Sequence, residues 1–343
     1  MADYILLTGA RKNVGDFLIG ERGRQLLAQY RPDRTSVTWD RFAPLDDRID
    51  VVNGSRAVLL LGGPAYAADF HPSIYPLTRP LAKIAVPVIP LALGWSGRPA
   101  DPSRFQFSPA SLDALRWIHS RIPASSCRDV VTRDVLRRHG IENTVMTGCT
   151  AWHHLPSEGR PFRVPADVRR VVVTVAAGRH LYRQNIAVMQ QVKARFPDAT
   201  RYCVFHRGIG WDAHTSIPNA IFHTALAHEA RRLRYEVVDA GYDLQKIDFY
   251  EDCDLHIGYR VHAHLLFLSI RRPSFLIHED GRGMAASLSL GTADVSAWEP
   301  DVVATLMKNI DRAIDDRFSG FAGVAAALDQ AHAAMREFVL RLP

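Results

Sequence analysis

Residues Leu255–His264, with the sequence LHIGYRVHAH, form the passage that decides the fold class. The apolar run over 255–257 has the length of a buried strand, Gly258 ends it, and an apolar helix is predicted over 261–270. A strand that passes through a glycine turn into a helix is the repeating connection of parallel sheets flanked by helices. The passage therefore predicts an α/β protein, in which such turns lie at the carboxyl edge of a sheet, where ligands bind.

Short apolar runs alternate with amphipathic segments along the rest of the chain, which extends this prediction to its full length. In the first half, strands are predicted at 4–8, 57–61, 87–93, 125–128 and 144–146, and helices at about 15–30, 73–84, 111–120 and 130–139. In the second half, strands are predicted at 170–175, 201–205, 236–238, 255–257 and 274–277, and helices at about 181–196, 219–233, 243–250, 261–270, from 283, and through 321–340.

The segment 155–168, LPSEGRPFRVPADV, contains three prolines and a glycine and predicts a linker. We therefore expect two Rossmann-like domains, 1–158 and 166–315, followed by a C-terminal helical segment, 316–343, that could pack back on the first domain. Two such domains with a cleft between them describe the GT-B-type arrangement of many sugar-modifying transferases. This locates a ligand site in the cleft and leaves its chemistry open.

The composition excludes several classes of protein. The chain has 343 residues and 47% of them are hydrophobic, which excludes wholesale disorder and fits two globular domains. Its four cysteines form no CxxC pair, which argues against a disulfide framework or a zinc site and favours a reducing cytoplasm. Neither a secretory signal nor an apolar run of membrane-spanning length is present in the sequence.

The formal net charge is +6, from 42 Lys and Arg against 36 Asp and Glu. A mildly basic surface favours anionic ligands, or peripheral contact with the anionic inner face of the membrane, and equally fits a solvated surface. We expect no nucleic-acid partner.

Two turns in the first half are candidate parts of the cleft. The stretch 7–16, LTGARKNVGD, joins the first predicted strand to the first helix, and its glycine spacing fits neither a dinucleotide fingerprint nor a P-loop. Asn13 and Asp16 place polar groups at the helix entrance, where a simple helix cap is the alternative interpretation. Gly62 and Gly63 end the strand at 57–61 and open the same edge of the sheet.

Three basic residues are candidates for anion binding and proton transfer. Arg128 leaves a short strand at the start of a helix, where a guanidinium and free N–H groups can hold a phosphate or carboxylate. A surface pair of Asp129 with Arg128 or with Arg133 is the alternative. Arg260 and His262 project to one side while the chain is still extended, beside a helix N-terminus. A histidine beside a bound phosphate suits a general acid, although a lone histidine there is more often a cap or a packed residue.

Metal sites are not expected. The DxD sequence Asp252–Asp254 precedes its strand instead of following it, so a solvated loop is favoured over a metal–nucleotide site. His262 and His264 diverge once helical, and the histidine-rich stretch 206–228 lacks HExxH spacing. His206, just past a predicted strand, could still touch a ligand.

Five segments in this order resemble the polysaccharide pyruvyl transferase family. They are Asn13-Val14-Gly15-Asp16, Gly62-Gly63, Ser126-Cys127-Arg128-Asp129, Arg137-Arg138-His139-Gly140-Ile141 leading to Met146-Thr147-Gly148, and Gly258-Tyr259-Arg260-Val261-His262. The resemblance spans most of the chain and implies a GT-B-type transferase that moves an enolpyruvyl-derived group from phosphoenolpyruvate to a sugar as a ketal. It implies that a saccharide or lipid-linked saccharide acceptor binds on the N-terminal side of the cleft and the donor on the C-terminal side. It implies no metal and no further cofactor, and it leaves open whether the protein forms a homo-oligomer.

Carried over to this sequence, the resemblance makes His262 the general acid and assigns donor binding to Arg128 and Arg260. Asn13 and Asp16 would line the N-terminal face of the cleft, with Gly62, Gly63 and His206 as further cleft residues. The sequence departs from the family pattern at Cys149, where members often have Asp. The loop 278–282 reads HEDGR instead of a Tyr–Asp–Lys type, so that Arg282 would supply the usual cation.

Two other functions remain open at this point. A GT-B-type nucleotide-sugar glycosyltransferase would share the architecture, but the Glu-x7-Glu pair of retaining members is missing, because Ser287 stands at the second position counted from Glu279. A non-catalytic sugar- or phosphate-binding relative would share it too.

Overall fold

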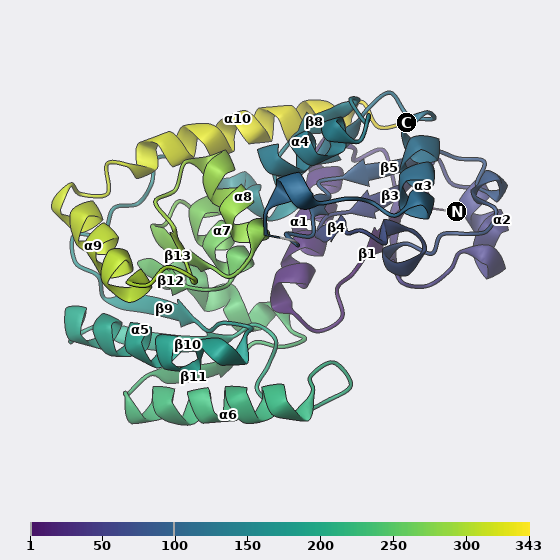
Figure 1. The fold of residues 1–343 in the computed structure, drawn as a ribbon. Coiled ribbons are helices and arrows are strands. Elements are labelled where there is room, and N and C mark those ends of the chain that lie inside the picture. Colours follow the sequence, from purple (N-terminus) through teal and green to yellow (C-terminus); the bar gives the residue numbers. More distant parts are fainter. Residues whose placement is uncertain (1, 99) are drawn as a thin grey trace.

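The computed structural model describes residues 2–98 and 100–343, which form two α/β halves with a parallel sheet in each (Figure 1). The N-terminal half has the strand order β2-β1-β3-β5, with β1 (Tyr4–Thr8), β2 (Ser36–Asp40), β3 (Ala57–Leu61) and β5 (Val88–Leu91). Every residue of β1 and β3 is buried, as expected for central strands of a sheet covered on both faces. The sheet is extended through a bridge between Leu93 and Cys127.

Helices and short strands complete this half. The helices are α1 (Val14–Tyr30), α2 (Ile49–Asn53), α3 (Pro109–His119) and α4 (Val130–Arg138), and the short parallel pairs are β4 (Pro64–Tyr66) with β6 (Gly94–Trp95) and β7 (Ser125–Cys127) with β8 (Thr144–Met146). Because β1 lies between β2 and β3, the chain leaves β1 and β3 in opposite directions, and a crevice opens after these two strands. The turns at 9–13 and 62–63 follow these two strands.

The C-terminal half has a six-stranded parallel sheet in the order β11-β10-β9-β12-β13-β14. Its strands are β9 (Arg170–Thr174), β10 (Thr200–Phe205), β11 (Glu236–Asp239), β12 (Leu255–Gly258), β13 (Ser274–His278) and β14 (Val295–Ser296). Counted within this half, the order is 3-2-1-4-5-6, which is that of a Rossmann fold, and its switch point lies between β9 and β12. The strand–glycine–helix passage of the sequence is therefore at the position where such a sheet binds a ligand.

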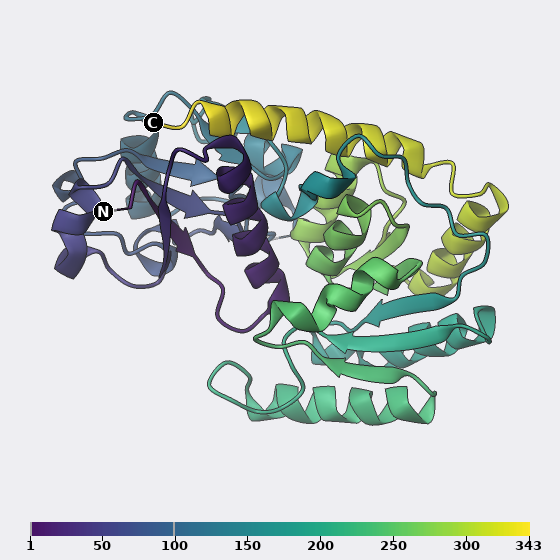
Figure 2. The ribbon, with the colours of Figure 1, turned by 180° about the vertical axis from the view of Figure 1, so that it is seen from behind.

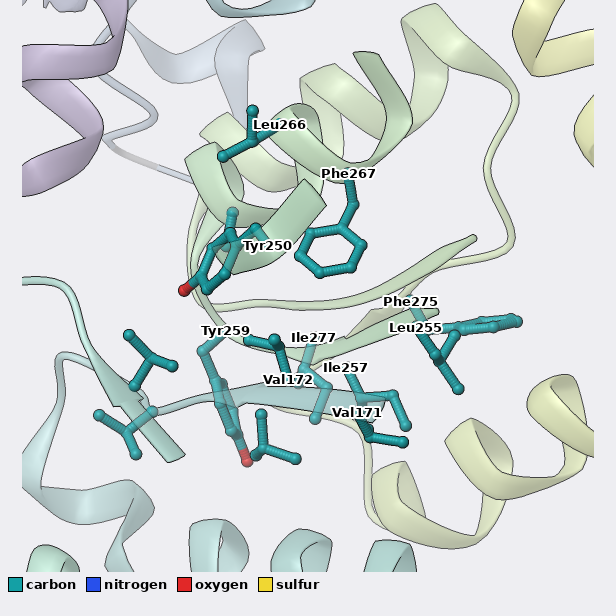
Figure 3. Packing of buried hydrophobic residues seen from close by; sticks show 14 of the residues in the cluster. Val171, Val172, Tyr250, Leu255, Ile257, Tyr259, Leu266, Phe267, Phe275 and Ile277 are labelled. Atoms are coloured by element: carbon teal, nitrogen blue, oxygen red, sulfur yellow. The ribbon is translucent and has the colours of Figure 1, made fainter. Parts of the chain in front are cut away.

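The helices of this half are α5 (Tyr182–Arg195), α6 (Ile217–Arg232), α7 (Val261–Ser269), α8 (Gly281–Leu290) and α9 (Val302–Asp315). In Figure 1, α5 lies beside β9 and β10, α6 lies beneath β11, and α7 and α8 lie above these strands. Figure 3 shows part of the core, where Val171 and Val172 of β9 and Leu255 and Ile257 of β12 lie beneath Phe267 of α7.

The C-terminal helix α10 (Phe321–Leu340) runs from one half to the other along one side of the molecule (Figures 1 and 2). Its first turns bury Val324 and Leu328 in the core of the C-terminal half, and its last turns bury Phe338 and Val339 in the core of the N-terminal half. The chain end is also held there, since the Tyr4 hydroxyl donates to the Pro343 carbonyl (2.6 Å). This helix ties the two halves together on the side away from α6.

Most predicted elements are present with bounds within a few residues, two differ, and several short or edge elements were not predicted. A helix over 73–84 was the wrong prediction: prolines 72, 76 and 80 interrupt helical hydrogen bonding, and the segment forms a short turn at Phe70–Ile74 and a 3₁₀ turn at Leu81–Lys83. The segment Leu244–Asp252 is a 3₁₀ helix instead of an α-helix. The edge strand β2 was missed because three of its five residues are exposed and polar. The short elements β4, β6, β14 and α2 were not predicted either. No helix in the described part of the chain is long and apolar enough to span a membrane.

Candidate active site

The two halves meet through the turn that follows β1. The Val14 N–H, in the first turn of α1, donates to the His206 carbonyl after β10 (3.0 Å), and the Tyr242 N–H donates to the Lys12 carbonyl (2.8 Å). The Lys12 ammonium is buried and paired with Asp212 in the loop after β10. The entrance of α1 is thus inserted among the loops of the C-terminal half, which brings the crevice of the first sheet to the switch point of the second.

Arg260 lies at this switch point and is the N-cap residue of α7. The Tyr259 N–H donates to the Thr174 carbonyl (3.1 Å) and the Arg260 N–H to Thr174 Oγ1 (3.2 Å), so the turn is fastened to the end of β9. The guanidinium Nε and Nη2 of Arg260 are buried, and no described residue accepts a hydrogen bond from them. Burial lowers the pKa of Arg260 to about 10, which leaves it charged at neutral pH. A buried cation with free donors is poised for an anion.

A chain of buried polar side chains supports this turn from below. The Thr174 hydroxyl contacts His256 Nε2 (2.8 Å), and the Ser274 hydroxyl contacts both His256 Nδ1 (2.7 Å) and His264 Nδ1 (2.8 Å). Burial lowers the pKa of both histidines, so they are neutral at pH 7. Because neutral imidazoles can donate at one nitrogen and accept at the other, this chain fixes Thr174 and with it the backbone of Arg260.

His262 shares one small pocket with Arg128 and Arg282. The other residues that line the pocket are Asp129, Cys149, Trp152, Val261, Leu265 and Ala286. Burial, together with the charges of Arg128, Arg282 and Arg260, lowers the pKa of His262 to about 3. The imidazole is therefore neutral in the free protein at neutral pH, and an anion bound among these arginines would raise its pKa again.

Arg128 and Arg282 already have anionic partners, unlike Arg260. Arg128 Nε donates to the Asp129 carboxylate (3.0 Å) and its Nη2 to the Trp95 carbonyl (2.7 Å). Arg282 holds the Asp280 carboxylate through Nε (2.9 Å) and Nη2 (2.6 Å). The alternative of an Arg128–Asp129 pair is thus present, but it is buried beside the pocket and not on the surface. Gly94 and Gly97 give these two arginines room, since a Cβ at either position would collide with them.

Asp16 and Asn13 lie on the N-terminal side of this site. Burial raises the pKa of Asp16. A hydrogen bond from Asn13 and the positive charges of Arg41, Arg282 and Arg207 lower it by less than burial raises it. The Asn13 side chain does not cap α1, which leaves its amide for the Asp16 carboxylate. A carboxyl with a raised pKa in a cleft of arginines is a candidate acid or base.

The remaining predicted cleft residues contribute mainly through their backbones. Gly62 and Gly63 have φ values of +59° and +81°; Gly62 packs on Ile19 of α1, and Gly63 lies beside Arg41. His206 is buried, and its Nε2 is hydrogen-bonded to the Tyr250 hydroxyl (2.9 Å). Its carbonyl accepts the hydrogen bond from the Val14 N–H of the N-terminal half.

Arg41 was missed by the sequence reasoning. It follows the unpredicted edge strand β2, and the alternating pattern of Ser36–Asp40 was the only signal for it.

The DxD sequence has a structural role. Asp254 accepts from the N–H groups of Arg169 (2.8 Å) and Arg170 (2.9 Å) at the start of β9, and Cys253 is buried. Among residues 2–98 and 100–343, no group of three or more His, Cys, Asp or Glu side chains is arranged to hold a metal ion.

Comparison with known proteins gives the family and the fold. The model of the polysaccharide pyruvyl transferase family matches residues 13–280, and no curated protein matches the sequence. Among solved structures, MnaA of S. aureus with UDP is 11% identical with a TM-score of 0.59, over 99% of this chain and 95% of that chain. The UDP-GlcNAc 2-epimerase of Neisseria meningitidis bound to UDP-GlcNAc is 10% identical with a TM-score of 0.57, over 98% of both chains. At such low identity these structures show the fold alone, a GT-B-type pair of α/β domains with a cleft between them.

Proposed function

The chain belongs to the polysaccharide pyruvyl transferase family, and we propose that it transfers the enolpyruvyl-derived group of phosphoenolpyruvate to a saccharide, forming a ketal and releasing phosphate. The observation that carries this proposal is that Nε and Nη2 of Arg260, two positions before His262 at the switch point, are buried with no acceptor among the described residues. Phosphoenolpyruvate is small and carries close to three negative charges at neutral pH. Such a donor matches the positive charge near His262, where Arg128 and Arg282 line the same pocket and the charge of Arg260 is felt as well.

Arg260 would bind the donor directly, because its Nε and Nη2 groups would gain acceptors that the described part of the chain does not supply. Arg128 and Arg282 would add positive charge from both sides of the cleft while their carboxylate partners keep them in position. We base this division on the hydrogen bonds of the three arginines, and it would put the donor on the C-terminal side of the cleft.

His262 would be the general acid. Once the donor neutralises the arginines, the pKa of His262 rises and the imidazolium forms beside the enol ester. Its proton goes to the methylene carbon, and the carbon–carbon double bond supplies the electron pair, which leaves a cationic centre at the carbon that bears the carboxylate. A saccharide hydroxyl oxygen bonds to that centre.

Asp16 would accept the proton that this hydroxyl loses. The bond to the phosphate oxygen then breaks, phosphate leaves with the bonding electron pair, and a second hydroxyl of the same sugar closes the ketal. Two hydroxyl protons are released in total, of which one replaces the proton given by His262 and the other leaves with phosphate. Atoms and charges balance without a metal or a redox partner.

The test is a binding and turnover experiment. We expect phosphoenolpyruvate to raise the melting temperature of the protein, and incubation with it and a saccharide acceptor to release phosphate and to add a methyl singlet to the proton NMR spectrum of the acceptor. His262→Ala should lower turnover about 10²–10⁴-fold while the protein remains folded. Stabilisation by UDP or GDP, with none by phosphoenolpyruvate, would instead identify a nucleotide-sugar transferase.

A further inference from the structure

Trp298 is an exposed aromatic side chain that the reaction above does not use. It follows β14, is 62% exposed, and stacks on the His180 ring with a centroid separation of 5.0 Å and an angle of 15° between the planes. Because His180 covers one face of the indole, the exposed area lies on its other face and its edges. A large, flat apolar surface is thus presented to solvent.

The indole is held in place, although it is exposed. Its Nε1–H donates to the Glu279 carbonyl (3.1 Å). The neighbouring Ala297 donates its N–H to the His278 carbonyl (3.0 Å) and accepts from Gln184 Nε2 (3.0 Å). These bonds fix both the side chain and the backbone of the loop, which is the property expected of a pre-organised contact surface.

The same bonds connect Trp298 to the proposed donor site. Gln184 Oε1 accepts from the Tyr259 hydroxyl (2.8 Å), and Tyr259 directly precedes Arg260. The Glu279 carboxylate accepts from the Ala177 and Gly178 N–H groups (3.0 and 3.1 Å), in the turn that follows β9. Trp298 therefore lies at the carboxyl edge of the C-terminal sheet, beside the two turns that form its switch point.

We infer that Trp298, supported by His180, is a saccharide subsite that binds a pyranose ring of the acceptor on its free indole face. This inference rests on the proposed function, because it takes the acceptor to be a saccharide. The C–H groups on one face of a pyranose are apolar and slightly positive, and they match the negative face of an aromatic ring. Phosphoenolpyruvate has no ring that could stack on the indole, so the indole is left to a sugar unit of the acceptor.

The experiment compares Trp298→Ala and Trp298→Phe with Trp211→Ala, a matched control that removes another exposed tryptophan (69% exposed) in the loop after β10. The probes are tetrasaccharides of β-1,4-glucose, α-1,4-glucose, β-1,4-galactose and β-1,4-N-acetylglucosamine. Calorimetry measures saccharide binding and, separately, phosphoenolpyruvate binding in every variant, and the indole N–H signals in NMR spectra locate the bound saccharide in proteins that retain Trp298.

We expect at least one tetrasaccharide to shift the Trp298 signal. Trp298→Ala should weaken that binding about tenfold, while Trp298→Phe restores most of it and Trp211→Ala changes nothing. The affinity for phosphoenolpyruvate should stay the same in all three variants. In turnover assays with the bound saccharide, Trp298→Ala should raise the KM for the acceptor and leave kcat in place.

Two results would overturn the subsite. The first is that no tetrasaccharide shifts the Trp298 signal, or that Trp298→Ala leaves saccharide binding unchanged. The second is that UDP shifts the signal and the saccharides do not, which would assign the indole to a nucleotide base. The proposed function fails separately, if the saccharides bind at Trp298 but phosphoenolpyruvate neither binds nor releases phosphate.

Discussion

The imidazole of His262 lies against the α-carbon of Gly15, so that the proposed general acid of the C-terminal half packs on the first turn of α1 in the N-terminal half. A Cβ at position 15 would lie 2.6 Å from Cβ and 2.7 Å from Cγ of His262. Real Cβ atoms do not approach other atoms so closely, and therefore the ring and the helix can be this near only because residue 15 is glycine. The contact makes the position of His262 depend on closure of the two halves.

Gly15→Ala should for this reason lower kcat at least tenfold, because either His262 or the entrance of α1 has to move away. Gly20→Ala is a matched control in the same helix, since its nearest neighbour would be Arg24 Nη1 at 3.7 Å. We expect Gly20→Ala to leave turnover unchanged and to increase the free energy of unfolding by about 0.5–1 kcal/mol, as alanine stabilises helices relative to glycine. Equal turnover in the two variants would contradict the proposed contact.

Donor binding should be accompanied by proton uptake at His262. The pKa of His262 is about 3 in the free protein and rises when the donor neutralises the arginines around it. Between pH 3 and the pKa in the complex, the complex holds one more proton than the free protein, so the affinity falls as pH rises through that interval. Calorimetry in two buffers of different ionisation enthalpy should give an uptake of up to one proton at pH 7.

His262→Gln separates this proton from the one that phosphoenolpyruvate itself can bind. The variant should retain donor binding, and the buffer-dependent part of the enthalpy should decrease to the value that the donor alone accounts for. The same uptake in the wild type and in His262→Gln would exclude His262 as the proton acceptor in the complex.

Asp16→Asn should lower kcat about a hundredfold with little change in the affinity for phosphoenolpyruvate, because it removes the proposed base and keeps the shape of the side chain. Since burial raises the pKa of Asp16, the activity of the wild type should decrease toward acidic pH as this carboxylate is protonated, and Asp16→Asn should lack that decrease. Asp113→Asn, which changes an exposed carboxylate on α3, serves as the control and should keep the wild-type pH profile.

The sequence was sufficient to predict the parts of the site that are local in the chain. The strand, glycine and helix at 255–264 predict where Arg260 and His262 stand, because the turn after a parallel strand has a fixed relation to its sheet. The glycine pair at 62–63 and the entrance of α1 could be predicted for the same reason. The structure brings Arg128, His262 and Arg282 to one pocket.

The contacts between distant segments could not be predicted from one sequence. The approach of Gly15 to His262 depends on how the two halves close, and no local pattern encodes it. Arg41 follows an edge strand that is too exposed to form an apolar run in the sequence. Its position in the cleft therefore could not be predicted. The pairing of Arg282 with Asp280 is local, yet only the structure shows that it leaves Arg260 as the arginine of the three without a carboxylate partner.

This difference between the arginines predicts opposite effects on stability. Arg260 has a buried charge, and no residue in the described ranges accepts a hydrogen bond from its Nε or Nη2; the folded protein bears this cost when no anion is bound. Arg260→Met should therefore raise the free energy of unfolding of the free protein by about 1–2 kcal/mol, while it abolishes stabilisation by phosphoenolpyruvate. Arg128→Met should instead lower the free energy of unfolding by about 3–5 kcal/mol, because it leaves the buried Asp129 carboxylate without its cation.

Denaturant unfolding with and without phosphoenolpyruvate distinguishes the two variants. A loss of stability in Arg260→Met comparable with that in Arg128→Met would mean that Arg260 is a structural residue whose partner is in the protein. A gain in stability combined with a loss of donor binding would mean that the fold retains an unfavourable buried charge for the sake of its substrate. That outcome would identify Arg260 as the arginine that binds the anion and would distinguish it from Arg128 and Arg282. Their positive charge alone does not distinguish the three residues.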